Sequence, residues 1–229
     1  MDLKSNINNV KDRIREAAAR AGRDPDEIRL VAVSKRVQAV RVVEALNSGI
    51  DTFGENYAQE LRDKRKIVEV SSDSYVYWHF IGKLQKNKVK YIVGAVELIH
   101  SLDSVSVARE IDKKAQNMGT KAAVLVEVNT GGEETKGGVG STMLESFLEE
   151  ISKLKSLEIK GLMTMPPYFD DPERSRPYFR ELRELRDRFK SEYPGLRELS
   201  MGMSGDFEVA IEEGATIVRV GTSIFGPRD

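Results

Sequence analysis

Lys35 and Arg219 are cationic residues that directly follow or interrupt strongly apolar runs. Lys35 follows LVAVS (30–34), and Arg219 lies inside IVRV (217–220). A lysine amine that is desolvated at the end of a buried strand can lose its proton and attack an aldehyde. The alternative, for a lysine taken alone, is an edge residue whose stem covers apolar surface while its amine reaches solvent.

Arg219 raises a different question, because a guanidinium cannot be neutralised and needs an acceptor wherever it is buried. One interpretation is a structural ion pair with a carboxylate at a strand end, such as Glu55 or Glu127. The other is a hydrogen bond to an acceptor on a bound ligand. The residues alone leave both interpretations open.

Small polar residues and glycine gather after the last two apolar runs, 196–200 and 215–221. They are Ser200, Ser204, Gly221, Thr222 and Ser223. In barrels of alternating strands and helices, the loops after strands seven and eight often form a phosphate site together with a helix N-terminus. A helix that begins near Ser204 would add the positive end of its dipole. The alternative is that these residues only turn the chain and cap a helix.

Eight apolar, strand-like runs alternate with helical segments along the chain. The apolar runs cover 28–34, 51–54, 76–82, 96–102, 121–128, 157–163, 196–200 and 215–221. Helical periodicity covers 37–49, 56–70, 84–93, 104–119, 142–155, 174–190 and 207–214, and an amphipathic helix over 3–22 precedes the first run. Runs that are buried on both faces and joined by crossover helices indicate a parallel sheet.

Eight such units in roughly 200 residues fit one (β/α)8 barrel. The predicted fold is therefore α/β, a single TIM barrel with an extra N-terminal helix. A doubly wound open sheet is the rival, but it normally has fewer strands. No linker or low-complexity tract divides the chain, so we expect one domain over residues 1–229. The site of such a barrel lies at the carboxyl ends of its strands.

Helix boundaries carry local signals. Glycine is expected to end four of the helices, at Gly22, Gly49, Gly119 and Gly214. Thr142 and Glu145 form a capping-box pattern at the start of the helix over 142–155. Ser204 is the candidate cap of the helix over 207–214.

The composition argues against several classes of site. The net charge is −1, with 36 basic and 37 acidic side chains and no basic block, so neither nucleic acid nor an anionic membrane is an expected partner. The absence of cysteine excludes disulfides and thiolate chemistry, and it fits a reducing compartment. The two histidines, His79 and His100, lack metal-binding spacing, so no zinc site is expected.

Two further motifs are rejected. The N-terminus is too charged for a signal peptide, and no apolar run approaches the roughly 18 residues of a membrane helix, so a cytoplasmic protein is expected. GEETKG (132–137) has the glycine spacing of a P-loop, but Gly138 and Val139 follow where Lys and Ser or Thr are required.

Eight segments, in this order, resemble the pyridoxal phosphate homeostasis proteins, from about residue 5 to the C-terminus. They are LVAVSK (30–35), FGENYAQE (53–60), WHFIGKLQKNK (78–88), IHSLDS (99–104), VNTGGEETKGG (128–138), GLMTM (161–165), LSMGMSGDFEVAIEEGA (199–215) and RVGTSIFG (219–226).

The resemblance implies a fold-type III protein that binds pyridoxal 5'-phosphate (PLP) in a barrel similar to the N-terminal domain of alanine racemases. It implies that Lys35 holds PLP as a Schiff base, that Arg219 faces the pyridine nitrogen and that Asn56, in its GEN motif, lies beside the cofactor. His79 would line the pocket. The positions that match phosphate-binding residues are Ser200, Ser204, Gly221 and Thr222, with backbone contacts near Met201.

The expected function is intracellular PLP (vitamin B6) homeostasis by reversible binding. An arginine at the ring nitrogen disfavours a second positive charge there, which weakens PLP as an electron sink. The chain ends at Asp229, where a racemase would continue into a β-domain with a second catalytic base. The alternatives are a PLP-dependent racemase or lyase of low activity, and a barrel for another phosphorylated metabolite. Expected partners are PLP and apo PLP enzymes, and the expected state is a monomer.

Overall fold

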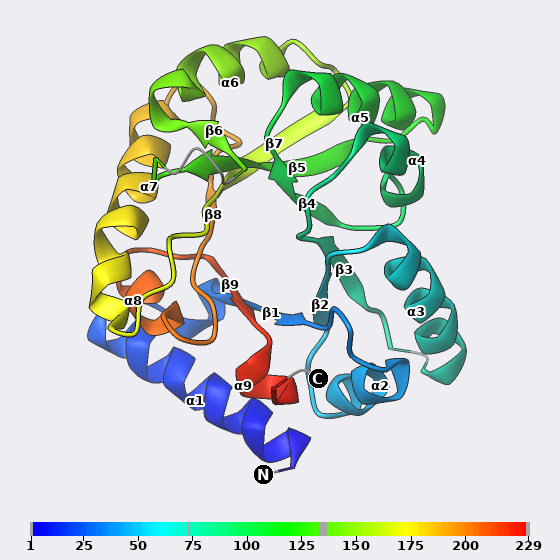
Figure 1. The fold of residues 1–229 in the computed structure, drawn as a ribbon, viewed down its shortest axis with the longest axis vertical. Coiled ribbons are helices and arrows are strands. Elements are labelled where there is room, and N and C mark those ends of the chain that lie inside the picture. Colours follow the sequence, from blue (N-terminus) through cyan, green and yellow to red (C-terminus); the bar gives the residue numbers. More distant parts are fainter. Residues whose placement is uncertain (1, 73, 133–136, 228–229) are drawn as a thin grey trace.

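Eight parallel strands close into a barrel in the computed structural model, which describes residues 2–72, 74–132 and 137–227. Neighbouring strands run in the order β4-β3-β2-β1-β9-β8-β7-β5, and the pairing of β4 with β5 closes the ring (Figure 1). Their bounds are β1 Arg29–Val33, β2 Thr52–Glu55, β3 Tyr77–Phe80, β4 Leu98–Leu102, β5 Ala122–Asn129, β7 Leu157–Met163, β8 Glu198–Ser200 and β9 Ile217–Val220. The two-residue β6, Val139–Gly140, pairs only with β5. The predicted barrel is confirmed, and the open sheet is wrong.

Helices surround this ring on the outside (Figure 1). In the described ranges they are α1 Leu3–Arg20, α2 Ala39–Asn47, α3 Ala58–Ser71, α4 Val89–Ile92, α5 Val105–Asn117, α6 Leu144–Ser152, α7 Arg176–Phe189, α8 Phe207–Glu212 and α9 Thr222–Phe225. The extra helix α1 packs against α8 and α9. Its buried positions recur at intervals of three and four, which confirms the amphipathic pattern. No helix in these ranges is long and apolar enough to cross a bilayer.

The glycines predicted to end helices do so, whereas the predicted capping box does not form. Gly22, Gly49, Gly119 and Gly214 all have φ between +63° and +97°, as residues that end helices in the left-handed region do. The predicted capping box is wrong, because a 3-10 turn over Ser141–Met143 precedes α6 and no side chain caps that helix. The helix predicted over 84–93 is shorter, with a 3-10 turn over Lys86–Lys88 before α4.

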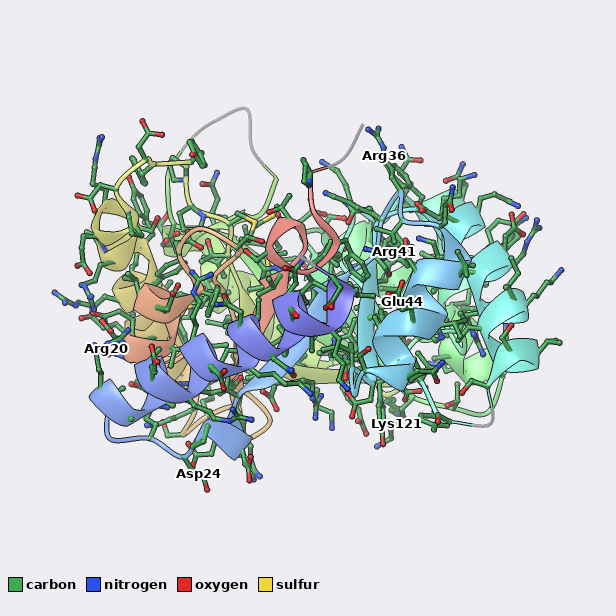
Figure 2. The ribbon with its side chains drawn as sticks, turned by 90° about the horizontal axis from the view of Figure 1, so that it is seen from below. Arg20, Asp24, Arg36, Arg41, Glu44 and Lys121 are labelled. Atoms are coloured by element: carbon green, nitrogen blue, oxygen red, sulfur yellow. The ribbon has the colours of Figure 1, made fainter. Side chains whose placement is uncertain are left out.

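The barrel has two distinct ends. Strands alternate with helices in one direction, so all carboxyl ends of the strands meet at one face and all amino ends at the other. In Figure 2 the barrel is seen from the side. Arg36, which follows β1, lies at the upper face, and Lys121, which precedes β5, lies at the lower face.

A buried ionic network between the barrel and α3 holds the end of β1. Lys64 Nζ lies 2.7 Å from Glu55 Oε1 and 2.7 Å from Glu60 Oε1, and it also donates to the Ser34 carbonyl. The Ser34 hydroxyl donates to the same Glu55 oxygen at 2.7 Å. Burial raises the pKa of Glu55, and the cation of Lys64 opposes that shift. The residue before Lys35 is therefore anchored on both its carbonyl and its hydroxyl.

The network generates a prediction about stability. Lys64→Met would leave the Glu55 carboxylate buried without its cation, which we expect to cost about 3–5 kcal/mol in the free energy of unfolding at neutral pH. Lys153→Met is the matched control, since Lys153 pairs with Glu149 on the surface of α6 with both side chains about two-thirds exposed; its cost should stay under about 1 kcal/mol. Denaturant unfolding of both variants measures the difference, and equal costs would contradict the role of the network.

Candidate functional site

A cavity of about 280 Å³ opens at the carboxyl ends of the strands and brings together three predicted site residues, Lys35, Asn56 and Arg219. Its other lining residues include Lys83, Glu127, Met165 and Met203. The three residues come from the ends of β1 and β2 and from within β9, so strands far apart in the sequence converge on one space.

Lys35 reaches this cavity from a tight turn. The amide of Val37 donates to the Ser34 carbonyl at 2.9 Å, and Arg36 has φ +60°, the left-handed region that a non-glycine residue enters at a cost. The Arg36 amide donates to the Glu60 carboxylate, which also binds Lys64. The same acidic side chain thus stabilises the turn and the buried network beneath it, and Lys35 is left half-buried at the cavity wall.

Asn56 follows β2 and carries an unsatisfied acceptor. Its Oδ1 atom is buried and receives no hydrogen bond from the described residues. Gly82 makes this placement possible, because a Cβ at position 82 would lie 2.3 Å from the Asn56 carbonyl oxygen. A buried amide oxygen beside a cavity is an acceptor for a ligand.

Arg219 is buried, with 4% of its surface exposed. Its Nη1 donates to Ser200 Oγ at 2.5 Å and its Nη2 to the Thr164 carbonyl at 3.0 Å. Burial lowers the pKa of Arg219 to about 10, against the opposing carboxylates of Asp206 and Glu127, so the guanidinium stays charged at neutral pH. No carboxylate of the described residues comes within 4 Å of it; the ion pair considered for this arginine does not form there.

Glu127, on β5, lines the cavity, although its position in the sequence suggested only an ion pair with Arg219. It is 8% exposed and lines the same space as Lys35. Burial raises the pKa of its carboxyl, and the nearby Asp103 raises it further. A signal was present, because Glu127 interrupts an apolar strand just as Arg219 does.

The loops after β8 and β9 meet, as the phosphate-site hypothesis requires. Ser204 Oγ accepts hydrogen bonds from the amides of Gly221, at 3.2 Å, and Ser223, at 3.4 Å. Ser204 therefore does not cap α8, whose N-cap residue is Asp206. Thr222 is exposed at the start of α9, so hydroxyls and amides from both loops face the same small region.

Met201 and Gly202 shape the first of these loops. Met201 is fully buried, and Gly202 has φ +89° with a carbonyl that accepts from the Arg219 amide at 3.0 Å. A Cβ at Gly202 would lie 2.6 Å from the Cβ of Ala210, so only glycine lets the loop lie against α8. The contact of Met201 with a phosphate stays a prediction.

Ser200 and His79 both take part in hydrogen bonds inside the barrel, and the contact of Ser200 with a phosphate stays a prediction. Ser200 Oγ is bonded to Arg219 and to His100 Nδ1, 2.9 Å away, and His100 Nε2 lies 2.9 Å from His79 Nδ1. These side chains form a hydrogen-bonded chain through the barrel interior. His79 lines a second cavity, with Arg29 at the start of β1, and not the one that contains Lys35.

Both histidines are neutral in the folded protein. Burial lowers the pKa of His79 to about 3, with a further contribution from the cation of Arg29. Burial also lowers the pKa of His100 well below its ordinary value, and the proximity of His79 and of the Arg219 cation lowers it further. His79 therefore lies in the barrel interior as a neutral side chain that is hydrogen-bonded to His100.

Part of the resemblance falls outside the described residues. The segment 128–138 and the rejected P-loop pattern at 132–137 both contain residues 133–136, which the structure does not describe.

The chain is similar to known proteins over nearly its whole length. The family model "Alanine racemase, N-terminal domain" matches residues 5–229. A pyridoxal phosphate homeostasis protein of Aquifex aeolicus (strain VF5) is 50% identical over 229 residues, which cover 100% of this chain and 99% of that protein. Its counterpart in Escherichia coli (strain K12) is 36% identical over 228 residues, covering 100% of this chain and 97% of that protein.

A solved structure with ligand is also similar. PipY of Synechococcus elongatus PCC7942, determined with PLP bound, superimposes with a TM-score of 0.81 at 34% sequence identity, covering 93% of this chain and 100% of that one. The similarity therefore extends over nearly the whole barrel.

The neutral histidines predict how stability responds to acid. Below about pH 6.5 the unfolded chain protonates its histidines while the folded protein does not, so each removes up to about 1.4 kcal/mol of stability per pH unit. For His79 the window extends down to its folded pKa of about 3. Glu55 and Glu127 have raised pKa values in the folded protein, so their buried carboxylates destabilise it at neutral pH. This destabilisation is lost as the pH falls and the carboxyl groups are protonated, which is opposite to the effect of the histidines.

A comparison of wild type with His79→Gln isolates the histidine effect, since both proteins share the two carboxylates. Between about pH 7.5 and about pH 5.5, the free energy of unfolding should fall less in His79→Gln than in wild type. Denaturant titrations at the two pH values measure this. An identical pH dependence, or an imidazole resonance that titrates near pH 6.5 in the folded wild type, would show that His79 is not held neutral.

Proposed function

The chain belongs to the alanine racemase N-terminal domain family and, within it, to the pyridoxal phosphate homeostasis proteins, and from that premise we propose that it binds PLP on Lys35 at the carboxyl end of its barrel. The function is PLP binding in PLP homeostasis, in line with its relatives and with the PLP-bound structure of PipY.

The observation that carries the proposal is the convergence of three kinds of group on one end of the barrel. PLP has an aldehyde, a pyridine ring and a phosphate. Lys35 offers an amine, Arg219 a fixed cation, and the loops around Ser204 and Gly221 offer hydroxyls and amides. The buried Asn56 Oδ1 atom, which lacks a donor among the described residues, supplies an acceptor beside them. The residues present fit the cofactor.

Lys35 is proposed to hold the cofactor as a Schiff base. When bound, PLP supplies an aldehyde for an amine to condense with and a ring that withdraws electrons. The turn at Arg36 and the network of Glu55 and Lys64 fix the backbone from which Lys35 extends. Because Lys35 is only half-buried, its amine lies where a small molecule can reach it.

Ser204 is proposed to bind the phosphate together with the amides it now accepts from. Its hydroxyl holds the loop after β8 against the first residues of α9, so the amides of Gly221 and Ser223 already point at one oxygen atom. Amides that converge in this way are suited to an anion. Thr222 lies between them and adds an exposed hydroxyl.

Arg219 is proposed to face the ring nitrogen and to limit reactivity there. Its guanidinium is charged, buried and fixed by two hydrogen bonds, so it cannot leave the site or become neutral at physiological pH. A fixed cation disfavours protonation of an adjacent nitrogen. This side chain therefore favours holding the cofactor over using it as an electron sink, which supports binding and release as the activity. We propose in addition that the protein acts as a monomer and passes PLP to apo-enzymes.

The spectrum of the protein with PLP tests the role of Lys35. Wild type titrated with PLP should gain the visible absorption band of a lysine adduct at one equivalent, and Lys35→Ala should lose this band while keeping its fold by circular dichroism. Lys83→Ala is the matched control, since Lys83 lines the same cavity but is largely exposed. A full band in Lys35→Ala, or its loss in Lys83→Ala, would contradict the assignment.

A further inference from the structure

A second cavity, of about 310 Å³, lies at the opposite end of the barrel from Lys35. Its lining comes from the amino ends of strands, including Arg29 at the start of β1, Leu98 at the start of β4 and Glu198 at the start of β8. It shares no lining residue with the cavity that contains Lys35. The proposed PLP site makes no use of it.

One residue that lines this cavity has a buried polar atom without a partner among the described residues. His79 is fully buried, and its Nε2 atom makes no hydrogen bond to any described residue. Its other ring nitrogen, Nδ1, is engaged by His100. A buried imidazole nitrogen without a partner costs free energy unless something else satisfies it.

The chain that leads to His79 determines what Nε2 needs. Arg219 can only donate, so Ser200 Oγ accepts from it and directs its own hydrogen to His100 Nδ1. His100 then carries its proton on Nε2 and donates to His79 Nδ1. His79, which lines the cavity, is left with a proton on its buried Nε2 atom that has no acceptor among the described residues. The reverse direction would leave two groups unsatisfied, the Ser200 hydrogen and the His79 lone pair.

Three cationic and two anionic side chains line this cavity. Arg29, Lys160 and Arg197 line the cavity along with the carboxylates of Glu97 and Glu198. Glu97 already accepts from the Tyr75 hydroxyl at 2.6 Å and Glu198 from the Thr216 hydroxyl at 2.5 Å.

Arg29 is the cation still available in this cavity. Lys160 pairs with Glu158 at 2.8 Å, and Arg197 Nε donates to the Pro194 carbonyl at 3.2 Å. Within the described part of the chain, Arg29 makes no side-chain hydrogen bond or ion pair, yet its charge acts on His79. A cation and a histidine whose N–H donor is buried and unpartnered thus line the same cavity, which is of ligand size.

We propose that the cavity at the amino end of the barrel binds a small oxyanion, a carboxylate or a phosphate, between His79 Nε2 and Arg29. An occupant that accepts from His79 would polarise the chain through His100 and Ser200 to Arg219. Binding at the two ends of the barrel would then be coupled and reciprocal. The coupling rests on the proposed PLP site, but the anion site itself does not.

Imidazole NMR of the PLP-free protein tests the anion site, because the chain has only two histidines. With ¹⁵N-labelled histidine, both rings should be neutral with the proton on Nε2. Titration with inorganic phosphate or with acetate, at constant ionic strength and near pH 7.5, should move the His79 Nε2–H resonance in a saturable way. Which of the two ions saturates at the lower concentration distinguishes phosphate from carboxylate.

Two variants decide whether the response is local. Arg29 is exposed, so its replacement should not unfold the barrel. Arg29→Gln is expected to weaken the apparent affinity of the anion, read from the His79 resonance, by at least about tenfold. Arg41→Gln, on the surface of α2 (Figure 2), is the control and should leave it unchanged. A His79 without a proton on Nε2, a resonance that neither ion moves, or an unweakened response in Arg29→Gln would overturn the proposal. The last outcome would place the anion elsewhere, and none of the three bears on PLP binding by Lys35.

Discussion

The buried charge of Arg219 is the constraint on which the interior of this barrel depends. A guanidinium cannot shed its charge, so the fold must surround it with acceptors, and it does so with the Ser200 hydroxyl and the Thr164 carbonyl. The Ser200 hydroxyl is thereby turned toward His100, and the orientation passes on to His79. One cation in β9 thus sets the protonation of two histidines and places a fixed positive charge at the wall of the cavity.

A second buried ionic network links α3 to the ends of β1 and β2. Lys64 on α3 binds Glu55 and the carbonyl of Ser34, and Glu60 extends the network to the turn after Lys35. Arg219 in β9, and Lys64 through its bonds at the end of β1, therefore hold two neighbouring strands at the wall of the cavity. Pairing of β1 with β9 joins them directly, since Val31 lies opposite Arg219. The backbone before Lys35 and the Arg219 side chain are held by buried hydrogen bonds, while the loops after β8 and β9 are held together by the longer bonds to Ser204.

Much of this could be predicted from the sequence because it depends on local patterns. Apolar runs between amphipathic segments gave the barrel, and Lys35 and Arg219 were identified because a charge at a buried strand needs a reason. The depth at which a side chain lies within the barrel could not be predicted from local sequence patterns. His79 and Ile81 share a face of β3 and its extension. Only the stagger of the strands decides that Ile81 lines the cavity with Lys35 and that His79 lines the cavity with Arg29. The hydrogen bond from Arg219 to Ser200 could not be predicted either, since the position of Ser200 after a strand does not reveal it. Thr142 failed as a cap because a 3-10 turn precedes its helix, which sequence pattern does not distinguish from a helical start.

The proposed function depends most directly on which lysine carries PLP. Reduction of the PLP-loaded protein with borohydride, followed by peptide mapping, identifies that lysine. We expect one adduct per chain, on the peptide that contains Lys35. An adduct on Lys83, which lines the same cavity, or on Lys64, or a spread over surface lysines, would contradict it.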